Sequence, residues 1–131
     1  MKKSILIVDD NEKVRSFLLD FFATRPTKFD VHGAKDGLDA VEKAPNIKPD
    51  LIVLDLSMPR LDGLAAARRL REMEIRVPII LFTSHADMVP VTEISVKGVN
   101  AVVMKPDLTT LNKHVEFFLN RQIPIGEAHV L

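Results

Sequence analysis

The sequence predicts an α/β domain built around a parallel sheet, and two patterns along the chain support this prediction. Short apolar runs recur at intervals and are predicted to be strands, at 4–8, 29–34, 50–55, 77–83 and 101–105. Segments whose apolar residues follow a helical spacing separate these runs. Five strands that alternate with five helices favour a parallel sheet, because parallel neighbours need a crossover connection, which is usually a helix.

The first half of the chain fits this alternation element by element. The run at 4–8 reads SILIV, and Asn11 is a suitable N-cap for the helix after it. The apolar face of that helix is formed by Val14, Phe17, Leu18 and Phe21. The run at 29–34 is followed by Asp36 and a second helix, whose apolar face is formed by Leu38, Val41 and Ala44. Within the run at 50–55, residues 51–54 are continuously apolar up to Asp55, which is typical of a strand covered on both faces.

The second half continues in the same way. Asp62 and Gly63 predict a turn into a third helix, whose apolar face is formed by Leu64, Ala67, Leu70 and Met73. On its polar face Arg68 and Glu72 are spaced to pair. A fourth helix is predicted from Val91 to Val96, because Pro90 suits a first turn and Gly98 an end. A fifth follows the run at 101–105, with its apolar face formed by Leu108, Leu111, Val115 and Phe118.

Length and composition limit the classes of function. The 131 residues suit one domain, predicted over 1–120, with 121–131 as a tail or the start of a linker. The 18 basic and 18 acidic residues balance, which argues against binding of nucleic acid or of an anionic membrane. The chain has no cysteine, so thiol chemistry is excluded. No apolar run reaches membrane-spanning length, and a cytoplasmic location is expected.

Polar residues follow four of the five predicted strands. Asp9 and Asp10 end the first, Asp55 the third, Thr83 the fourth and Lys105 the fifth. Parallel strands bring these ends to one edge of the sheet, where α/β domains bind their ligands. Three carboxylates that meet there would repel one another unless a cation lies between them. Oxygen ligands of this kind suit Mg²⁺, with Mn²⁺ as an alternative ion.

Lys105 and Thr83 extend this site to a phosphoryl group. An ammonium and a hydroxyl can hold anionic oxygens while Asp55 acts as the nucleophile. Taken singly, each residue has an ordinary structural explanation. Asp9 and Asp10 could cap a helix, Thr83 could cap a turn, and Lys105 could be a solvated lysine. Their joint placement at strand ends is what favours a phosphoryl site.

Four segments of the sequence then resemble the receiver domain of response regulators, over about residues 3–119. These segments are ILIVDDNEKVR, LIVLDLSMPRLDG, PIILFTS and VVMKP. The resemblance implies a flavodoxin-like, doubly wound (βα)₅ fold with strand order 2-1-3-4-5. It is similar to the single-domain chemotaxis regulators, which accept a phosphoryl group from a histidine kinase or a phosphotransfer protein.

The resemblance also implies roles for individual residues. Asp55 matches the phosphoacceptor, Thr83 the switch residue and Lys105 the lysine of the family. Asp10 is expected to ligate Mg²⁺ directly and Asp9 partly through water, together with a side-chain oxygen of Asp55. The remaining ligand is the backbone carbonyl of Ser57. The peptide bond between Lys105 and Pro106 is expected to be cis.

Three positions in this pattern concern switching and phosphoryl lifetime. Receivers usually carry an aromatic residue three positions before the lysine, but this chain has Val102 there and no tyrosine. Phosphorylation is therefore expected to move Thr83 and the loop after it without a rotating ring. Ser57 and His85 occupy the two positions that tune dephosphorylation in the family, although His85 could equally be an exposed loop residue.

The implied function is a phosphorylation-controlled binding switch rather than an enzyme with a separate substrate. Its output would pass to an unidentified protein partner or effector domain. The usual output face of the family spans residues 91–119 here and could support a homodimer. The chain could also be the receiver part of a larger regulator or hybrid kinase.

Two other functions remain as alternatives at this point. An aspartyl-phosphate phosphatase of the haloacid-dehalogenase type would need a second acid at position 57, where this chain has serine. A flavin-binding protein would need a phosphate loop rich in glycine and hydroxyl groups after the first strand. The acidic sequence DDNEKVR would instead repel a phosphate there.

Overall fold

A computed structural model describes residues 2–25, 29–95 and 97–120. All five predicted strands are present, as β1 (Ser4–Val8), β2 (Asp30–Ala34), β3 (Leu51–Leu54), β4 (Ile79–Thr83) and β5 (Ala101–Met104). They form one parallel sheet of order β2-β1-β3-β4-β5, which confirms the predicted fold class. The α-helices are α1 (Glu12–Ala23), α2 (Gly37–Ile47), α3 (Gly63–Glu72) and α4 (Leu108–Asn120). The predicted tail at 121–131 lies outside the described residues.

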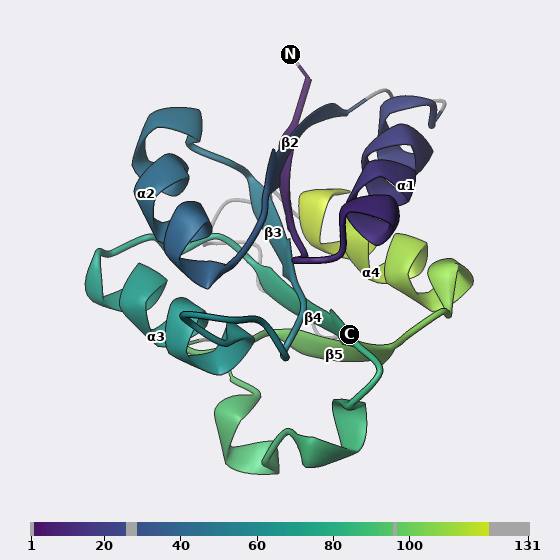
Figure 1. Ribbon diagram of the computed structural model, residues 1–131. Coiled ribbons are helices and arrows are strands. Elements are labelled where there is room, and N and C mark those ends of the chain that lie inside the picture. The colour runs from purple at the N-terminus through teal and green to yellow at the C-terminus, as the bar shows by residue number, and fades with distance from the viewer. Residues whose placement is uncertain (1, 26–28, 96, 121–131) are drawn as a thin grey trace, which may run out of the picture.

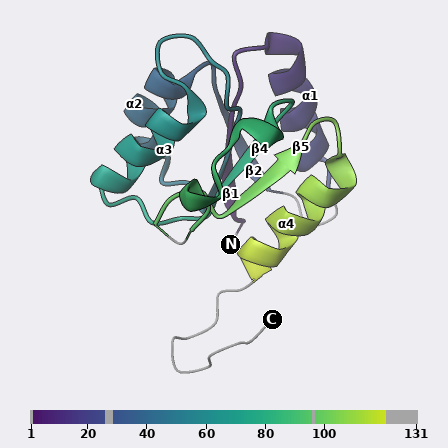
Figure 2. The ribbon, with the colours of Figure 1, turned by 90° about the horizontal axis from the view of Figure 1, so that it is seen from below.

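Helices cover both faces of the sheet, with α2 and α3 on one face and α1 and α4 on the other (Figure 1). The view from below shows the same two layers (Figure 2). Alternate residues of each central strand therefore enter different cores. One core contains Leu6, Val8, Ile52, Leu54, Ala40, Ala66 and Leu70, and the other contains Ile5, Ile7, Leu51, Val53, Leu18, Phe22, Leu111 and Val115. Burial on both faces explains the continuous apolar runs at 5–8 in β1, 51–54 in β3 and 79–82 in β4.

The starts of three helices are fixed by short local signals that the sequence displays. Asn11, Asp36 and Asp62 are the N-caps of α1, α2 and α3. Each side chain accepts a hydrogen bond from the backbone N–H three residues later, at 3.0, 2.8 and 2.9 Å. A cap of this kind satisfies an N–H group that has no partner inside the helix. The N-cap predicted at Asn11 is confirmed, and α2 and α3 follow Asp36 and the Asp62–Gly63 turn as predicted.

The predicted fourth helix at 91–96 is wrong for its described residues. Two 3₁₀ turns, η1 (Ala86–Met88) and η2 (Val91–Glu93), stand between β4 and β5, and Ile94 pairs with Val99 as an isolated parallel bridge. Val96 lies outside the described residues. The segment is rich in β-branched residues, which lose side-chain freedom in a helix. The fifth predicted helix is present and carries the label α4.

Arg71 of α3 holds the end of this β4–β5 segment in place. Its guanidinium donates to the carbonyl oxygens of Ile75, Val77 and Gly98, at 2.7 to 3.1 Å, and to the side-chain oxygen of Asn100 at 3.0 Å. The same Asn100 oxygen accepts from the N–H of Ile79, at the start of β4. One side chain thus links the end of α3 to the segments that precede β4 and β5.

A second arginine of α3 contacts the same segment. Arg68 forms an ion pair with Glu93 of η2, so the predicted pairing of Arg68 with Glu72 is wrong. Helical spacing would allow Arg68 to pair with Glu72, but the η2 turn brings the carboxylate of Glu93 to Arg68 instead. Among the described residues, no helix is both long enough and apolar enough to cross a bilayer.

Candidate functional site

The carboxyl ends of the strands are joined directly by backbone hydrogen bonds. The N–H of Asp55, just after β3, donates to the carbonyl of Val8 at the end of β1, at 3.0 Å. The N–H of Lys105, just after β5, donates to the carbonyl of Thr83 at the end of β4, also at 3.0 Å. The sheet order therefore brings all the predicted strand-end residues to one edge.

Three carboxylates meet at this edge, as the sequence predicts. One oxygen from each of Asp9, Asp10 and Asp55 lies within 4.8 Å of the others. Asp9 is 2% exposed and Asp55 is 9% exposed, whereas Asp10 is open to solvent. The cluster thus combines two acids set into the protein with one that solvent can reach.

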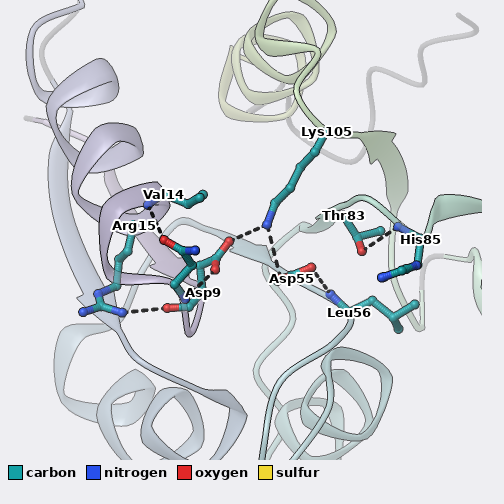
Figure 3. Close-up of polar contacts among 9 residues, drawn as sticks. Asp9, Val14, Arg15, Asp55, Leu56, Thr83, His85 and Lys105 are labelled. Carbon is teal, nitrogen blue, oxygen red and sulfur yellow. Dashed lines mark hydrogen bonds and ion pairs between the residues drawn. The ribbon is translucent and has the colours of Figure 1, made fainter.

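Lys105 is the cation that faces this cluster, and its ammonium bridges two of the acids (Figure 3). Its Nζ lies 2.7 Å from Oδ2 of Asp9 and 3.2 Å from Oδ2 of Asp55. Burial acts to lower the pKa of Lys105, but the hydrogen bond and attraction from Asp9, together with Asp55, outweigh it and raise that pKa above its usual value. The lysine is therefore held in its charged form.

The turn after β1 is fixed by contacts that keep Asp9 in place. Oδ1 of Asp9 accepts a hydrogen bond from the N–H of Asn11 at 2.9 Å. Arg15, one turn into α1, donates from a terminal nitrogen to the backbone carbonyl of Asp9 at 2.7 Å. Sequence reasoning missed Arg15, because a single arginine in a helix has no local feature that reveals a contact with the preceding turn.

Thr83 and His85 lie beside Asp55 on the side away from Asp9 in the view of Figure 3. Thr83 is fully buried, and its hydroxyl accepts a hydrogen bond from the N–H of His85 at 3.1 Å. His85 itself is exposed. Val102 is half-buried and packs against the core on the side of α2 and α3, so an aliphatic side chain fills the position where the family usually has a ring.

The loop from β3 to α3 forms one wall of the site. Asp10 and Ser57 line the same open cavity, of about 660 Å³, together with Met58, Pro59, Asp62, Leu64, Arg68 and Met88. Oδ1 of Asp55 accepts from the N–H of Leu56 at 2.8 Å. At the end of the loop, Gly63 packs so closely that a Cβ there would lie 2.2 Å from the carbonyl oxygen of Asp55.

A second, mainly apolar groove of about 270 Å³ borders the site from the side of α1 and α4. It is lined by Lys13, Val14, Phe17, Leu18, Phe82, Lys105, Pro106 and Leu108. Phe17 is 54% exposed, unlike Phe22, which is fully buried in the core. The peptide bond between Lys105 and Pro106 is cis, as the resemblance implies.

The donor atoms of the cluster fit a hard divalent cation. All three side chains offer carboxylate oxygens, which Mg²⁺ and Mn²⁺ prefer to nitrogen or sulfur ligands. Asp10 opens onto the 660 Å³ cavity, which leaves room for water molecules that Mg²⁺ usually retains. The chemistry of this donor set therefore suits the metal that the sequence predicts.

Comparison with known proteins decides the family. The family model of the response regulator receiver domain matches residues 5–116. This chain belongs to the response regulator receiver family. The receiver is thus a module of two-component signalling systems.

Curated relatives are longer than this receiver. Regulatory protein AtoC of Escherichia coli is 38% identical over 119 residues, which cover 90% of this chain and 25% of AtoC. Response regulator protein VraR of Staphylococcus saprophyticus is 34% identical over 106 residues, which cover 80% of this chain and 50% of VraR. The receiver therefore matches between a quarter and half of the length of these two proteins.

Solved structures match almost the whole receiver. The response regulator domain of Thermotoga maritima CheB has a TM-score of 0.80 at 28% identity, and the alignment covers 94% of this chain and 100% of that domain. A complex of CheX with CheY, BeF₃ and Mg²⁺ from Borrelia burgdorferi contains a chain with a TM-score of 0.80 at 26% identity, with 89% of each chain covered. That complex contains Mg²⁺ and a beryllofluoride, which mimics a phosphoryl group.

Proposed function

We propose that this receiver is a phosphorylation-controlled switch in which Asp55 accepts a phosphoryl group from the phosphohistidine of a kinase or phosphotransfer protein. A carboxylate oxygen of Asp55 attacks phosphorus, and the nitrogen–phosphorus bond of the donor breaks. The imidazole carries a proton on its other ring nitrogen, so when it leaves with the bonding electron pair it ends as a neutral ring. The observation that carries the proposal is the carboxylate cluster with the Lys105 ammonium between Asp9 and Asp55.

Each polar residue of the site has a part in this transfer. Lys105 supplies a fixed positive charge for the phosphoryl oxygens, which gain negative charge as the donor bond breaks. The Thr83 hydroxyl donates to a phosphoryl oxygen after it gives up its contact with the N–H of His85. We expect this to move the loop after β4 without a rotating ring, since Val102 is aliphatic.

Mg²⁺ would be held by the side chains of Asp9, Asp10 and Asp55 and by the backbone carbonyl of Ser57, with Mn²⁺ as a substitute. When bound, it supplies positive charge that offsets the repulsion between the carboxylates and the incoming phosphoryl oxygens. We assign to Ser57 and His85 the tuning of how water approaches the aspartyl phosphate. We propose that these reactions occur in the cytoplasm, where ATP supplies the phosphoryl group for histidine kinases.

The groove between α1 and α4 is the docking surface that we assign to the phosphoryl donor. It borders Lys105 and Pro106, and it displays Phe17, an exposed aromatic ring beside the site. Phe17→Ala should slow transfer from a phosphotransfer protein but leave labelling by acetyl phosphate unchanged, because the small donor needs no protein contact. Equal losses with both donors would contradict this assignment.

Output would pass through η1, η2, β5 and α4 to a separate partner, to an effector domain of a larger regulator, or to a second copy in a homodimer. This receiver is not proposed to act on a substrate other than its own phosphoryl donor. The described residues between β4 and β5 form no regular helix, so this face differs from the output face of residues 91–119 for which the sequence predicts a helix at 91–96.

Labelling with acetyl phosphate in Mg²⁺ tests the proposal. Intact-mass measurement should show one phosphoryl group per chain, and EDTA should prevent its addition. Asp55→Asn should abolish the labelling. Asp62→Asn is a matched control, because Asp62 lines the same cavity and asparagine caps a helix as well as aspartate does. Rapid release of phosphate from aryl phosphates would favour a phosphatase instead.

A further inference from the structure

The loop between β3 and α3 contains an arginine in an unusual backbone conformation. Arg60 has φ of 69°, in the left-handed region that disfavours residues with a Cβ. Two other described residues outside glycine have positive φ, Lys48 and Glu74, and both follow the end of a helix. Arg60 instead lies within the loop that borders the site, where glycine would adopt this conformation at lower cost.

The side chain of Arg60 gives a reason for an arginine at this position. Its Nε donates to Oδ2 of Asp36 at 2.8 Å, and a terminal nitrogen lies 2.6 Å from the same oxygen. Asp36 is only 4% exposed, and its other oxygen caps α2 through the N–H of Asp39 at 2.8 Å. The ion pair therefore ties the loop to the first turn of a helix that is itself fixed in the core.

The backbones of the loop and of α2 approach each other closely at this contact. A Cβ on Gly37, the first residue of α2, would lie 2.3 Å from the carbonyl oxygen of Leu61. The N–H of Gly63 donates to the carbonyl of Leu56 at 2.8 Å and closes the loop at its base. The loop that includes Ser57 is thus held at its base by Gly63 and on its outer side by Arg60 and Gly37.

We propose that the Arg60–Asp36 ion pair positions this loop for the divalent cation, so that Arg60 is a positioning residue for metal binding. The inference rests on the proposed function, because it needs Ser57 to contribute its backbone carbonyl. Ser57 lines the same cavity as Asp10, and Arg60 lies three residues further along the loop. Without the ion pair, the left-handed turn at Arg60 loses its support, and the carbonyl is no longer held ready for the ion.

Magnesium titration by calorimetry of the complete chain tests this role. Mutation of a residue that hydrogen-bonds to a metal ligand typically weakens metal affinity by about 10- to 100-fold. Arg60 acts on Ser57 only through the loop, so Arg60→Gln should raise the Mg²⁺ dissociation constant by less, about 3- to 10-fold. Arg60→Lys should lie between the parent and Arg60→Gln, since lysine keeps the charge but not the planar fork. Asp36→Asn should match Arg60→Gln, because asparagine keeps the helix cap and loses the ion pair.

Two further variants separate positioning from a loss of stability. Val115→Ala removes buried atoms from α4 in the other core, so it should lower the melting temperature and leave the Mg²⁺ dissociation constant unchanged. The double variant Arg60→Gln with Asp36→Asn should bind Mg²⁺ no more weakly than either single variant.

The inference is overturned if Arg60→Gln and Asp36→Asn bind Mg²⁺ like the parent, or if Val115→Ala weakens binding to the same extent. Failure of the parent to bind Mg²⁺ would overturn the proposed function as well. An intact parent site with unaffected variants would overturn only the role of Arg60.

Discussion

Replacing Lys105 with methionine tests the electrostatics of the site. The substitution keeps an unbranched apolar chain but removes the ammonium that lies 2.7 Å from Asp9 and 3.2 Å from Asp55. The side chains of Lys105, Asp9 and Asp55 are 16%, 3% and 11% exposed. Water can therefore take the place of the ammonium only in part, and three carboxylates remain together without their cation.

The size of the effect follows from this burial. Removal of one partner from a buried ion pair costs about 3–5 kcal/mol, and the partial exposure of Lys105 favours the lower end, about 3 kcal/mol. For a domain of this size such a loss corresponds to a drop in melting temperature of roughly 10 °C. Mg²⁺ should bind more tightly to the variant, because a competing positive charge has gone. We expect at least a tenfold lower dissociation constant, which corresponds to about 1.4 kcal/mol.

Thermal unfolding followed by circular dichroism, over a series of Mg²⁺ concentrations, measures both effects. Lys97→Met is the matched control, since Lys97 is exposed and its side chain makes no ion pair among those found in the described residues. The melting temperature of Lys105→Met should rise more steeply with Mg²⁺ than those of the parent and the control. The reasoning is refuted if Lys105→Met binds Mg²⁺ no more tightly than the parent, or if its cost without Mg²⁺ equals that of Lys97→Met.

Three further predictions concern the framework of the site. Arg71→Met should lower the free energy of unfolding by about 2–4 kcal/mol in urea titrations, because four acceptor groups lose their donor. An equal loss in Arg69→Met, which changes an exposed neighbour on α3, would contradict this explanation. Gly63→Ala should lower the free energy of unfolding by about 2 kcal/mol or more and impair labelling of Asp55, since the added Cβ would lie 2.2 Å from the backbone oxygen of Asp55. Gly33→Ala should lower it less, because the nearest atoms to the added Cβ are side-chain atoms at 3.3 Å. The last concerns acid stability. Burial acts to raise the pKa of Asp36, but the hydrogen bond from Asp39 and the contacts with Arg60 hold that pKa below its ordinary value of 3.8. Its contribution to stability is therefore present above about pH 3.8 and is lost as the pH falls through the lowered pKa. Between about pH 5 and pH 2, Asp36→Asn should lose less stability than the parent, and equal slopes of stability against pH would show that the ion pair contributes nothing.

Elements that depend on local signals could be predicted from the sequence. Continuous apolar runs predicted the central strands, because burial on both faces demands apolar side chains at every position. Asn11 predicted the start of α1, because a cap bonds to an N–H only three residues away, and the Asp62–Gly63 turn predicted where α3 follows. The cluster of Asp9, Asp10 and Asp55 followed from the strand ends, since parallel strands end at one edge.

Contacts between distant segments could not be predicted in this way. The ion pair of Arg60 with Asp36 joins residues from two different crossovers, and only the packing of α2 on the loop brings them together. The helix predicted at 91–96 is absent from the described residues, because Pro90 and Gly98 mark possible helix ends but do not offset the low helix propensity of the β-branched residues between them. Arg68 forms its ion pair with Glu93 instead of Glu72, because the path of the η2 turn brings Glu93 to Arg68.

The most direct test of the central claim is to locate the phosphoryl group. After labelling with acetyl phosphate and Mg²⁺, reduction with borohydride converts an aspartyl phosphate to homoserine, which peptide mass spectrometry can assign to one position. The account predicts homoserine at Asp55 and its loss when Mg²⁺ is withheld. Homoserine at Asp9 or Asp10, or labelling of Asp55 that does not depend on a divalent cation, would contradict it.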